Sequence, residues 1–280
     1  MKVTIAQTAG FCMGVSRAVN MALTASMQGG EKPIYTYGPL IHNPQALQFL
    51  NEKGISILKN IPKTGAGTII IRAHGVPPSD KKKIEKAGFN LIDATCPRVV
   101  RVQTIIAKYR KLGYTSIIFG DKEHPEVKGL IGCAGNKVRV VNRLSEFDNL
   151  PIFKKAVIVA QTTQNLYQFK QAVKTAKTGF PHYKIFNTIC DSTRKRQEEI
   201  KKLADSVDAA IVIGSYNSGN TCRLAEIASQ TGKPSFHIET ETDIDFSLIA
   251  RFKLVGVTAG ASTPDWVIKN VCEAIEKNYE

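Results

Sequence analysis

Short β-rich runs alternate along the chain with longer segments in which apolar residues recur at helical spacing. Such runs predict β-strands, and a helical segment between successive strands predicts parallel sheets built from strand–helix units. Nine runs show the pattern, at residues 3–6, 34–37, 69–71, 91–93, 117–119, 157–159, 184–186, 211–213 and 254–257. The sequence therefore predicts an α/β protein.

Three of the nine runs lead into a cysteine. These residues, Cys12, Cys96 and Cys190, lie 84 and 94 residues apart, which is about a third of the 280-residue chain. Each cysteine therefore marks one of three similar lobes, each a small parallel sheet flanked by helices. The N-terminal strand would complete the third lobe. The expected lobes are residues 14–97, residues 98–190, and residues 191–280 together with 1–13.

The other six runs end in polar loops. One set of loops carries His42, His124 to Glu126, and Ser218 to Asn220, and the second carries His74, Thr162 to Thr163, and Ser262. In open parallel sheets, ligands bind at the carboxyl ends of the strands. If the three edges face one another, three cysteines and six polar loops converge on one central cavity.

Composition narrows the class of protein. The chain is 43% hydrophobic and 22% charged, which is typical of a globular protein. No apolar run approaches the roughly 20 residues needed to span a bilayer, and Gln7 interrupts the N-terminal run before a signal-peptide core can form. Six cysteines without such a signal favour reduced thiols. We expect a soluble, cytoplasmic protein.

The formal charge of +14 favours an anionic partner. The densest basic runs are Lys81–Lys83 and Arg194–Arg196. Both are interpreted as solvated helix faces, because acidic residues alternate with them further along. Aromatic residues do not interleave with either run, so a nucleic-acid groove is poorly supported.

The three spaced cysteines do not form a C-x-x-C zinc pattern, and a lone cysteine is usually a small core residue. Their shared context suggests more: each follows a strand and comes just before a predicted helix. Pro97 suits a first helical turn, and Ser192 or Thr193 suits an N-cap. A helix N-terminus favours thiolate, which suits an iron–sulfur cluster. Three thiolates would leave one iron open to an exogenous ligand.

The remaining cysteines have a different context. Cys133 is expected in a loop before a strand, and Cys222 and Cys272 in helices. All three are interpreted as structural.

The polar loops suit an anion. His42, His74 and His124 could donate to phosphate oxygens, and so could the side chains of Ser218, Asn220 and Ser262. A phosphate-binding cavity and a set of ordinary loop residues are both compatible with this pattern. His182 and His237 lack the context and are expected to be ordinary surface or half-buried residues.

Glu126 is the only carboxylate in the six loops. Beside histidines and a cluster it would be a proton donor or relay, and otherwise a first-turn helix residue that complements the dipole. Thr162 and Thr163 could cap a helix that starts near Asn165, or orient Glu126 or a substrate.

Seven motifs in this order resemble the 4-hydroxy-3-methylbut-2-enyl diphosphate reductase (IspH/LytB) family, over about residues 3–272. They are Gly10-Phe11-Cys12, Ile41-His42-Asn43, Ala73-His74-Gly75, Asp93-Ala94-Thr95-Cys96-Pro97, His124-Pro125-Glu126-Val127, Gln161-Thr162-Thr163 and Val257-Thr258-Ala259-Gly260-Ala261-Ser262.

The resemblance implies a trefoil of three lobes around one 4Fe–4S cluster, held by Cys12, Cys96 and Cys190 with one open iron. Two electrons and two protons would remove the substrate hydroxyl as water, giving isopentenyl and dimethylallyl diphosphate, the last step of the methylerythritol phosphate route. Glu126, Thr162 and His124 would form the catalytic set. The substrate set would be His42, His74, His124, Thr162, Thr163, Ser218, Asn220 and Ser262.

One motif departs from the family, whose Ser-Ser-Asn loop is Ser218-Gly219-Asn220 here. The loss of one hydroxyl is expected to leave the diphosphate site intact. No Gly-rich dinucleotide motif is evident, so the electrons would come from outside. An acidic ferredoxin or flavodoxin would match the basic chain. We expect a monomer with no nucleic-acid or membrane partner.

Two alternatives remain. A quinolinate-synthase-like dehydratase would also hold a cluster with three cysteines, but its substrate carries carboxylates rather than a diphosphate. A non-catalytic protein that binds a phosphorylated ligand would need no cluster. Iron content separates the second alternative, because a plain binder would be colourless.

Overall fold

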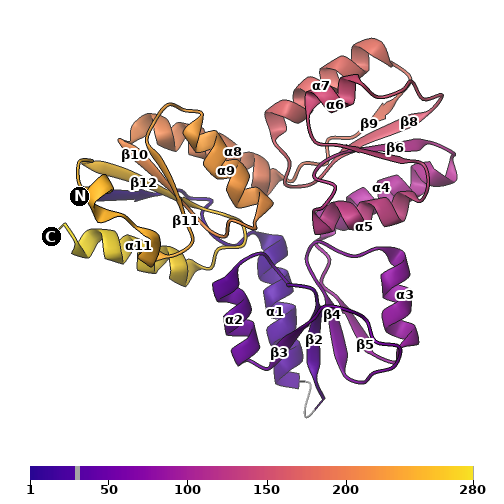
Figure 1. The fold of residues 1–280 in the computed structure, drawn as a ribbon, viewed down its shortest axis with the longest axis horizontal. Helices are drawn as coiled ribbons and strands as arrows, with labels where there is room; N and C mark the ends of the chain where they lie inside the picture. Colours follow the sequence, from indigo (N-terminus) through magenta and orange to yellow (C-terminus); the bar gives the residue numbers. More distant parts are fainter. Residues whose placement is uncertain (29–31, 280) are drawn as a thin grey trace. The chain divides into compact units, whose positions relative to one another are not determined.

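The computed structural model describes residues 1–28 and 32–279. The chain forms two compact units. The first comprises Met1–Val15, His42–Gln48 and Asp191–Glu280, and the second comprises Ser16–Ile41 and Phe49–Cys190. The ribbon drawings show the sheets of each unit flanked by helices (Figure 1).

The strands form three four-stranded sheets in which every described pairing is parallel. This confirms the predicted α/β class and the role of the N-terminal strand in the third sheet. The first sheet has the order β3 (Ile55–Leu58), β2 (Ile34–Tyr37), β4 (Thr68–Ile71), β5 (Asn90–Asp93). The second has β7 (Val138–Val141), β6 (Thr115–Phe119), β8 (Ala156–Ala160), β9 (Lys184–Ile185). The third has β11 (Ser235–Ile238), β10 (Ala209–Ile213), β12 (Leu254–Ala259), β1 (Lys2–Ile5).

All nine predicted strands are present, and the structure adds β3, β7 and β11. Each added strand lies at one edge of its sheet. An edge strand pairs on one side only, and these three are largely half-buried or exposed. Polar residues such as Ser56, Arg139 and His237 therefore interrupt their apolar pattern, and the sequence signal is weak.

Helices connect the strands. In chain order they are α1 (Met13–Gln28), α2 (Pro44–Glu52), α3 (Pro78–Lys86), α4 (Pro97–Lys111), α5 (Pro125–Ala134), α6 (Leu144–Asp148), α7 (Leu166–Gly179), α8 (Asp191–Ser206), α9 (Gly219–Ser229), η1 (Glu241–Asp243), α10 (Phe246–Ile249) and α11 (Asp265–Lys277). No helix of the described residues is long and apolar enough to cross a membrane.

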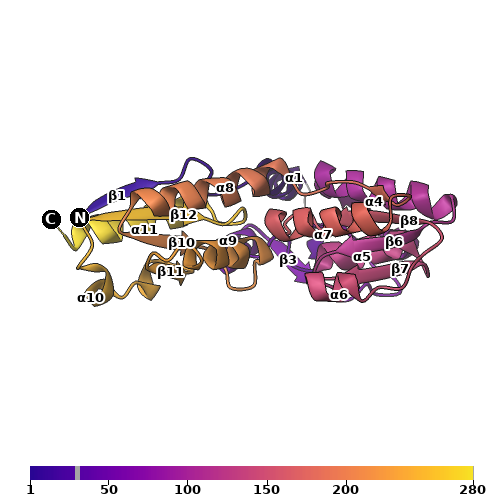
Figure 2. The same cartoon turned by 90° about the horizontal axis from the view of Figure 1, so that it is seen from above.

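Alternate residues of the central strands point to opposite faces of each sheet. In the second sheet, Ile117 and Ile158 pack with α6 and α7, whereas Ile118 and Val159 pack with α4 and α5. The edge-on view shows helices on both sides of the strands (Figure 2). Burial on both faces explains why the sequence shows continuous apolar runs rather than alternation.

The third sheet is built in the same way. Residues of α10 and α11 cover one face, and residues of α8 and α9 cover the other. Gly256 lets α8 approach β12 closely, because a Cβ at that position would lie 2.8 Å from Leu203 Cγ. The position of α8 matters because this helix begins directly after Cys190.

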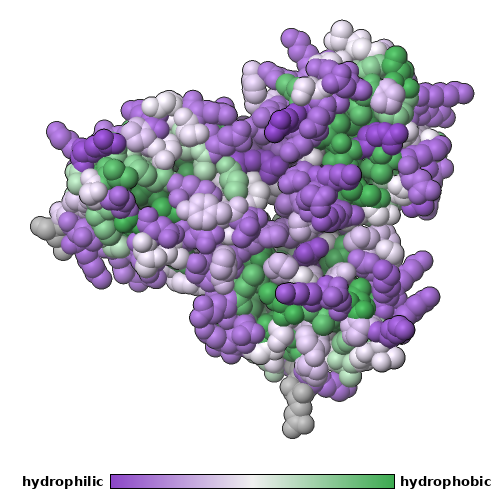
Figure 3. All heavy atoms as spheres, in the orientation of Figure 1, coloured by the Kyte–Doolittle hydropathy of each residue, from purple (hydrophilic) through white to green (hydrophobic). Residues whose placement is uncertain are grey.

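Two sequence expectations about particular residues are wrong. Cys133 lies inside α5, not in a loop, and is buried against α4 and the second sheet. In the second basic run, the side chain of Arg196 is only 3% exposed, whereas Lys82 and Lys83 of the first run are exposed as predicted. In the space-filling view, hydrophilic residues (purple) reach outward, and hydrophobic residues (green) appear mainly over the sheets (Figure 3).

The three sheets share one strand order. In the first two sheets, the chain runs from a central strand to an edge strand, crosses back to the second central strand, and then reaches the far edge. In the third sheet the first three steps are the same, and the far edge is the N-terminal strand β1. The order reverses between the two central strands, which is the point where open parallel sheets bind ligands. The central pairs are β2 with β4, β6 with β8, and β10 with β12. The six predicted polar loops follow these six strands.

Candidate functional site

A similar four-residue turn follows β4, β8 and β12. The turns are Arg72–Gly75, Gln161–Gln164 and Gly260–Thr263, each closed by a hydrogen bond from its last N–H to its first carbonyl at 2.9, 3.1 and 3.0 Å. The third positions hold His74, Thr163 and Ser262. Three of the predicted substrate residues therefore occupy equivalent positions in the three sheets.

Each predicted cluster cysteine is bonded to one of these turns. The N–H of Cys96 donates to Ala73 O at 2.9 Å, that of Cys190 to Thr162 O at 2.9 Å, and that of Cys12 to Ala261 O at 3.2 Å. Each acceptor is the second residue of its turn. One backbone hydrogen bond thus holds each cysteine beside a predicted substrate residue.

A helix begins immediately after each of the three cysteines: α1 at Met13, α4 at Pro97 and α8 at Asp191. The first-turn position predicted for Pro97 is confirmed. The predicted cap after Cys190 is wrong, because Ser192 and Thr193 already lie inside the first turn of α8. Each thiol therefore stands next to the positive end of a helix dipole, which stabilises a thiolate.

The loops after β2, β6 and β10 lead into α2, α5 and α9, and each of these helices has a polar N-cap. The caps are Asn43, His124 and Ser218. In each case the cap carbonyl accepts the N–H four residues on, at 3.1, 3.0 and 2.9 Å. His124 and Ser218 were predicted as substrate residues, whereas Asn43 was missed. Its equivalence to the other two emerges only from the helix starts.

The carboxylate of Glu126 is 1% exposed and accepts two hydrogen bonds from Thr162. Thr162 donates its N–H to Oε1 at 2.7 Å and its hydroxyl to Oε2 at 2.6 Å. Of the two predicted alternatives for Thr162, the structure supports orientation of Glu126, because Asn165 caps α7. Glu126 is a first-turn residue of α5, as the second of its two predicted alternatives requires.

The ring of His124 connects Glu126 to a second histidine. Its Nδ1 accepts the N–H of Glu126 at 3.2 Å, which leaves the proton of a neutral ring on Nε2. The ring lies edge-on to that of His74, with centroids 5.2 Å apart. In the second unit the structure thus brings together His74, His124, Glu126 and Thr162.

In the first unit the structure gathers another predicted group. The hydroxyl of Ser262 donates to the carbonyl of His42 at 3.0 Å and lies 3.4 Å from the hydroxyl of Ser218. Asn220 is 6% exposed, and its Nδ2 has no hydrogen-bond partner among the described residues. A buried amide without a partner is costly, so a ligand oxygen there would be stabilising.

The approach to Cys12 is fixed by Arg196 and Glu199 of α8, which no sequence motif connects to the site. Arg196 donates from Nη2 to Gly10 O at 2.6 Å, and Glu199 accepts the N–H groups of Gln7 at 2.7 Å and Thr8 at 2.9 Å. The hydroxyl of Thr8 donates to the same carboxylate. No local motif marks these contacts, because 186 to 192 residues separate the partners.

The approaches to the other two cysteines are fixed within the second unit. Asp93 accepts the N–H of Thr95 at 2.9 Å and pairs with Lys81 at 2.5 Å. Burial acts to raise the pKa of Asp93, but these hydrogen bonds outweigh it and bring the pKa below its ordinary value. Before Cys190, the hydroxyl of Thr188 donates to Ala160 O at 2.6 Å.

The other three cysteines differ from this pattern, and none of the six in the described chain forms a disulfide. Burial raises the pKa of Cys133, and it raises the pKa of Cys272 to about 11, so both stay neutral thiols. Cys222 lies on α9 as predicted, with its thiol exposed. His182 is exposed and His237 half-buried, as expected.

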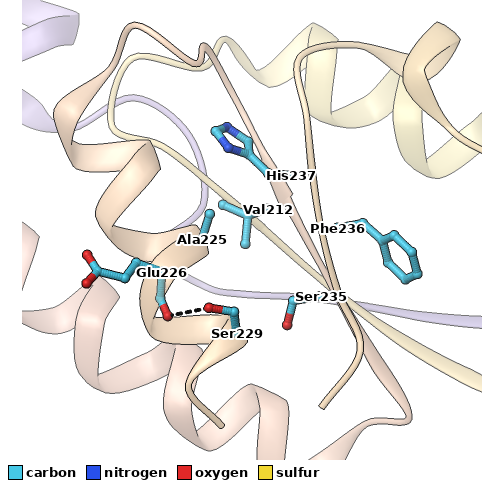
Figure 4. Close-up of a pocket in the computed structure, with 7 residues that line it drawn as sticks. All are labelled: Val212, Ala225, Glu226, Ser229, Ser235, Phe236 and His237. Atoms are coloured by element: carbon cyan, nitrogen blue, oxygen red, sulfur yellow. Dashed lines mark hydrogen bonds between the residues drawn. The ribbon is translucent and has the colours of Figure 1, made fainter. Parts of the chain in front are cut away.

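A cavity of about 300 Å³ lies between α9 and β11 in the first unit (Figure 4). Val212, Ala225 and Phe236 form its apolar part, and Glu226, Ser229, Ser235 and His237 complete the lining. None of the predicted site residues lines it.

The fold and the strand-end loops define an α/β protein with polar, cysteine-bearing loops beyond three similar parallel sheets. A model of the LytB protein family matches residues 3–276, so the chain belongs to this family.

The chain is 44% identical over 277 residues to "4-hydroxy-3-methylbut-2-enyl diphosphate reductase" from Geotalea uraniireducens, covering 99% of this chain and 98% of the relative. The protein of the same name from Geobacter sulfurreducens is 43% identical over 277 residues, with the same shares covered.

Two solved structures are similar. The E-1-hydroxy-2-methyl-but-2-enyl-4-diphosphate reductase from Plasmodium falciparum superposes with a TM-score of 0.92 at 28% identity, covering 97% of this chain and 87% of that chain. A reductase described as the terminal enzyme of the non-mevalonate pathway gives a TM-score of 0.71 at 41% identity, covering 99% and 100%.

Glu199→Gln tests the anchor of the Cys12 loop. Burial acts to raise the pKa of Glu199, but hydrogen bonds from Thr8 and Gln7 bring it below its ordinary value. The stabilisation is therefore present above the unfolded pKa of about 4.3 and is lost as the pH falls through the folded value. We expect Glu199→Gln to lower the free energy of unfolding near neutral pH and to flatten its fall in acid, as measured by urea denaturation.

Glu198→Gln is the matched control, because Glu198 is exposed and, within residues 1–28 and 32–279, pairs only with Arg194 of its own helix, at 2.9 Å. It should follow the wild-type pH dependence. If Glu199→Gln also follows it, the carboxylate does not anchor the loop.

Proposed function

We propose that this chain catalyses the reductive removal of the hydroxyl group of 4-hydroxy-3-methylbut-2-enyl diphosphate, giving isopentenyl and dimethylallyl diphosphate. The relatives quoted above carry the name of this reductase and match nearly the full chain. The observation that carries the proposal is the repeated hydrogen bond from a cysteine N–H to a turn that presents His74, Thr163 or Ser262. In all three sheets, this bond places a cysteine, which can bind a metal, beside a residue whose side chain can bind an anion.

The thiols of Cys12, Cys96 and Cys190 would hold one 4Fe–4S cluster. They fit this group because each stands at a helix start, outside any disulfide of the described chain, on a backbone fixed by hydrogen bonds. When bound, such a cluster supplies electrons and an open iron position for the substrate oxygen. The proposal includes three lobes with the predicted boundaries and a monomeric, cytoplasmic enzyme.

Glu126 would provide the protons. Thr162 donates hydrogen bonds to both oxygens of Glu126. These bonds hold the carboxyl group in one orientation, and a general acid must be positioned in this way. His124, whose Nδ1 accepts from the Glu126 backbone, would present Nε2–H to the substrate. Protonation of the departing oxygen lets it leave as water.

The diphosphate would be held by donors from several loops: His42, His74, His124, Thr162, Thr163, Ser218, Asn220 and Ser262. Support comes from the unpartnered Nδ2 of Asn220 and the short distances among Ser218, Ser262 and the His42 carbonyl. Gly219 starts α9 between Ser218 and Asn220. Its N–H stands at a helix N-terminus, where an anion is favoured, so the missing hydroxyl is compatible with the site.

A small acidic electron-transfer protein would dock on α4. This helix carries five basic residues and no acidic one, and it starts at Cys96. A basic helix that begins next to a cluster ligand would attract an acidic partner to that ligand.

The reaction itself is tested with anaerobically reconstituted protein and reduced methyl viologen. Oxidation of the dye that depends on 4-hydroxy-3-methylbut-2-enyl diphosphate, with both C5 diphosphates as products, supports the proposal. An intact cluster without turnover would overturn the substrate assignment.

Glu126→Gln should keep the cluster and bind substrate but lose about a hundredfold or more in kcat. Near-normal turnover of this variant would remove the proton role.

Cysteine-to-serine variants test the cluster ligands. Serine at position 12, 96 or 190 removes a thiolate and should cost most of the bound iron and the brown absorption. Cys133→Ser is the control, because Cys133 packs in the core of the second sheet and faces no predicted ligand. Equal iron content in all four proteins would contradict the ligand assignment.

Charge reversal on α4 tests donor docking. Arg101, Lys108 and Lys111 are exposed on this helix, and Lys170, Lys174 and Lys177 are exposed on α7 of the same unit. Changing the α4 residues to Glu should lower kcat/KM for an acidic ferredoxin about tenfold or more and weaken its salt dependence. The same change on α7 should have little effect. Turnover with methyl viologen should survive in both, and an equal loss in both would overturn docking at α4.

A further inference from the structure

Asn43 is among the most deeply buried polar residues of the molecule, at 1% exposed. Its Oδ1 accepts the N–H of Ala46 at 2.8 Å and so caps α2. This bond fixes which amide atom is oxygen. The other amide atom, Nδ2, has no hydrogen-bond partner among the described residues.

A buried amide donor without a partner is unfavourable, and most buried polar groups in folded proteins are paired. Asn43 therefore needs an explanation beyond capping. Aspartate would cap α2 as well without bringing a donor into the buried site. The asparagine amide caps the helix with its oxygen and adds an NH2 group that has no partner among the described residues, which indicates an acceptor supplied by a ligand.

The position of Asn43 in the fold indicates which ligand. It is the N-cap of the helix after the first central strand, as His124 and Ser218 are in the second and third sheets. The cap carbonyl accepts the N–H four residues on in all three cases. His124 and Ser218 belong to the proposed diphosphate set, and Asn43 is the third equivalent residue.

The neighbours of Asn43 in the first unit agree with this position. The carbonyl of His42, which belongs to the peptide bond to Asn43, accepts the hydroxyl of Ser262 at 3.0 Å. That hydroxyl is 3.4 Å from Ser218 Oγ. Asn43 is thus one peptide away from a contact between two residues of the proposed diphosphate set.

We propose that Asn43 binds the substrate directly, by donating its Nδ2–H to a diphosphate oxygen. The inference rests on the proposed function and adds a residue to its binding set. An amide donor is neutral, so it contributes at every pH at which the protein is folded. Its contribution should therefore appear in diphosphate affinity more than in the rate of the chemical step.

Inorganic pyrophosphate is the probe, titrated by calorimetry into the cluster-loaded protein. Asn43→Ser keeps a capping oxygen and removes the amide, and Asn43→Asp keeps shape and cap but replaces the donor with a carboxylate. We expect affinity to fall about tenfold with Ser and further with Asp, because the latter also repels the anion. KM for the diphosphate substrate should rise in parallel, with a smaller change in kcat.

Asp245→Asn is the matched control, since Asp245 is an exposed N-cap of α10 in the same unit, with its Oδ1 3.0 Å from the N–H of Ser247. It should bind pyrophosphate like the wild type. Thermal unfolding of every variant shows whether a loss of affinity is a loss of fold.

The outcomes separate this inference from the proposed function. If the wild type turns over substrate and both folded Asn43 variants bind pyrophosphate as tightly as it does, Asn43 is only a cap and the inference falls alone. If the wild type neither binds pyrophosphate nor turns over substrate, the proposed function falls and the inference with it.

Discussion

The backbone hydrogen bond from each cysteine N–H to the turn beyond a central strand is the interaction on which the site depends. It joins the far edge strand's loop to the central strand's loop, from Cys96 to Ala73, Cys190 to Thr162 and Cys12 to Ala261. A backbone bond of this kind tolerates any side chain on either partner. Three sheets can therefore keep one geometry while carrying histidine, threonine and serine at equivalent positions of their turns.

The side chains around these bonds restrict motion at each cysteine by different means. Asp93 holds the Thr95 turn, Thr188 bonds to β8, and Glu199 holds the loop before Cys12. Rigid placement matters for a metal ligand, because a loosely held thiolate forms a poorly defined site. The helix that starts after Cys190 also carries Arg196 and Glu199, so one element serves two cysteine loops.

Glu126 and Asn43 illustrate two uses of burial. Glu126 is buried with both oxygens accepting hydrogen bonds from Thr162, which holds the carboxylate in one orientation, as its proposed role in proton transfer requires. Asn43 is buried, and its Nδ2 group has no hydrogen-bond partner among the described residues. This group is therefore available to donate to the proposed ligand. In both cases the helix start holds the side chain in place. The free-energy cost of burying the polar group is offset by the proposed role of that group in the site.

The sequence by itself determined the α/β class, nine strands and the loops that carry the polar residues, because buried strands and their ends leave local patterns. Tertiary structure decided what those patterns omit. The strands β3, β7 and β11 have weak signals because polar residues interrupt their short apolar runs. Arg196 looked solvated because one of its partners, Gly10, lies 186 residues away. Asn43 was quoted in a motif but not assigned, since its equivalence to His124 and Ser218 exists only in the folded helix starts. Local periodicity reports burial, whereas contacts between distant segments depend on the folded chain.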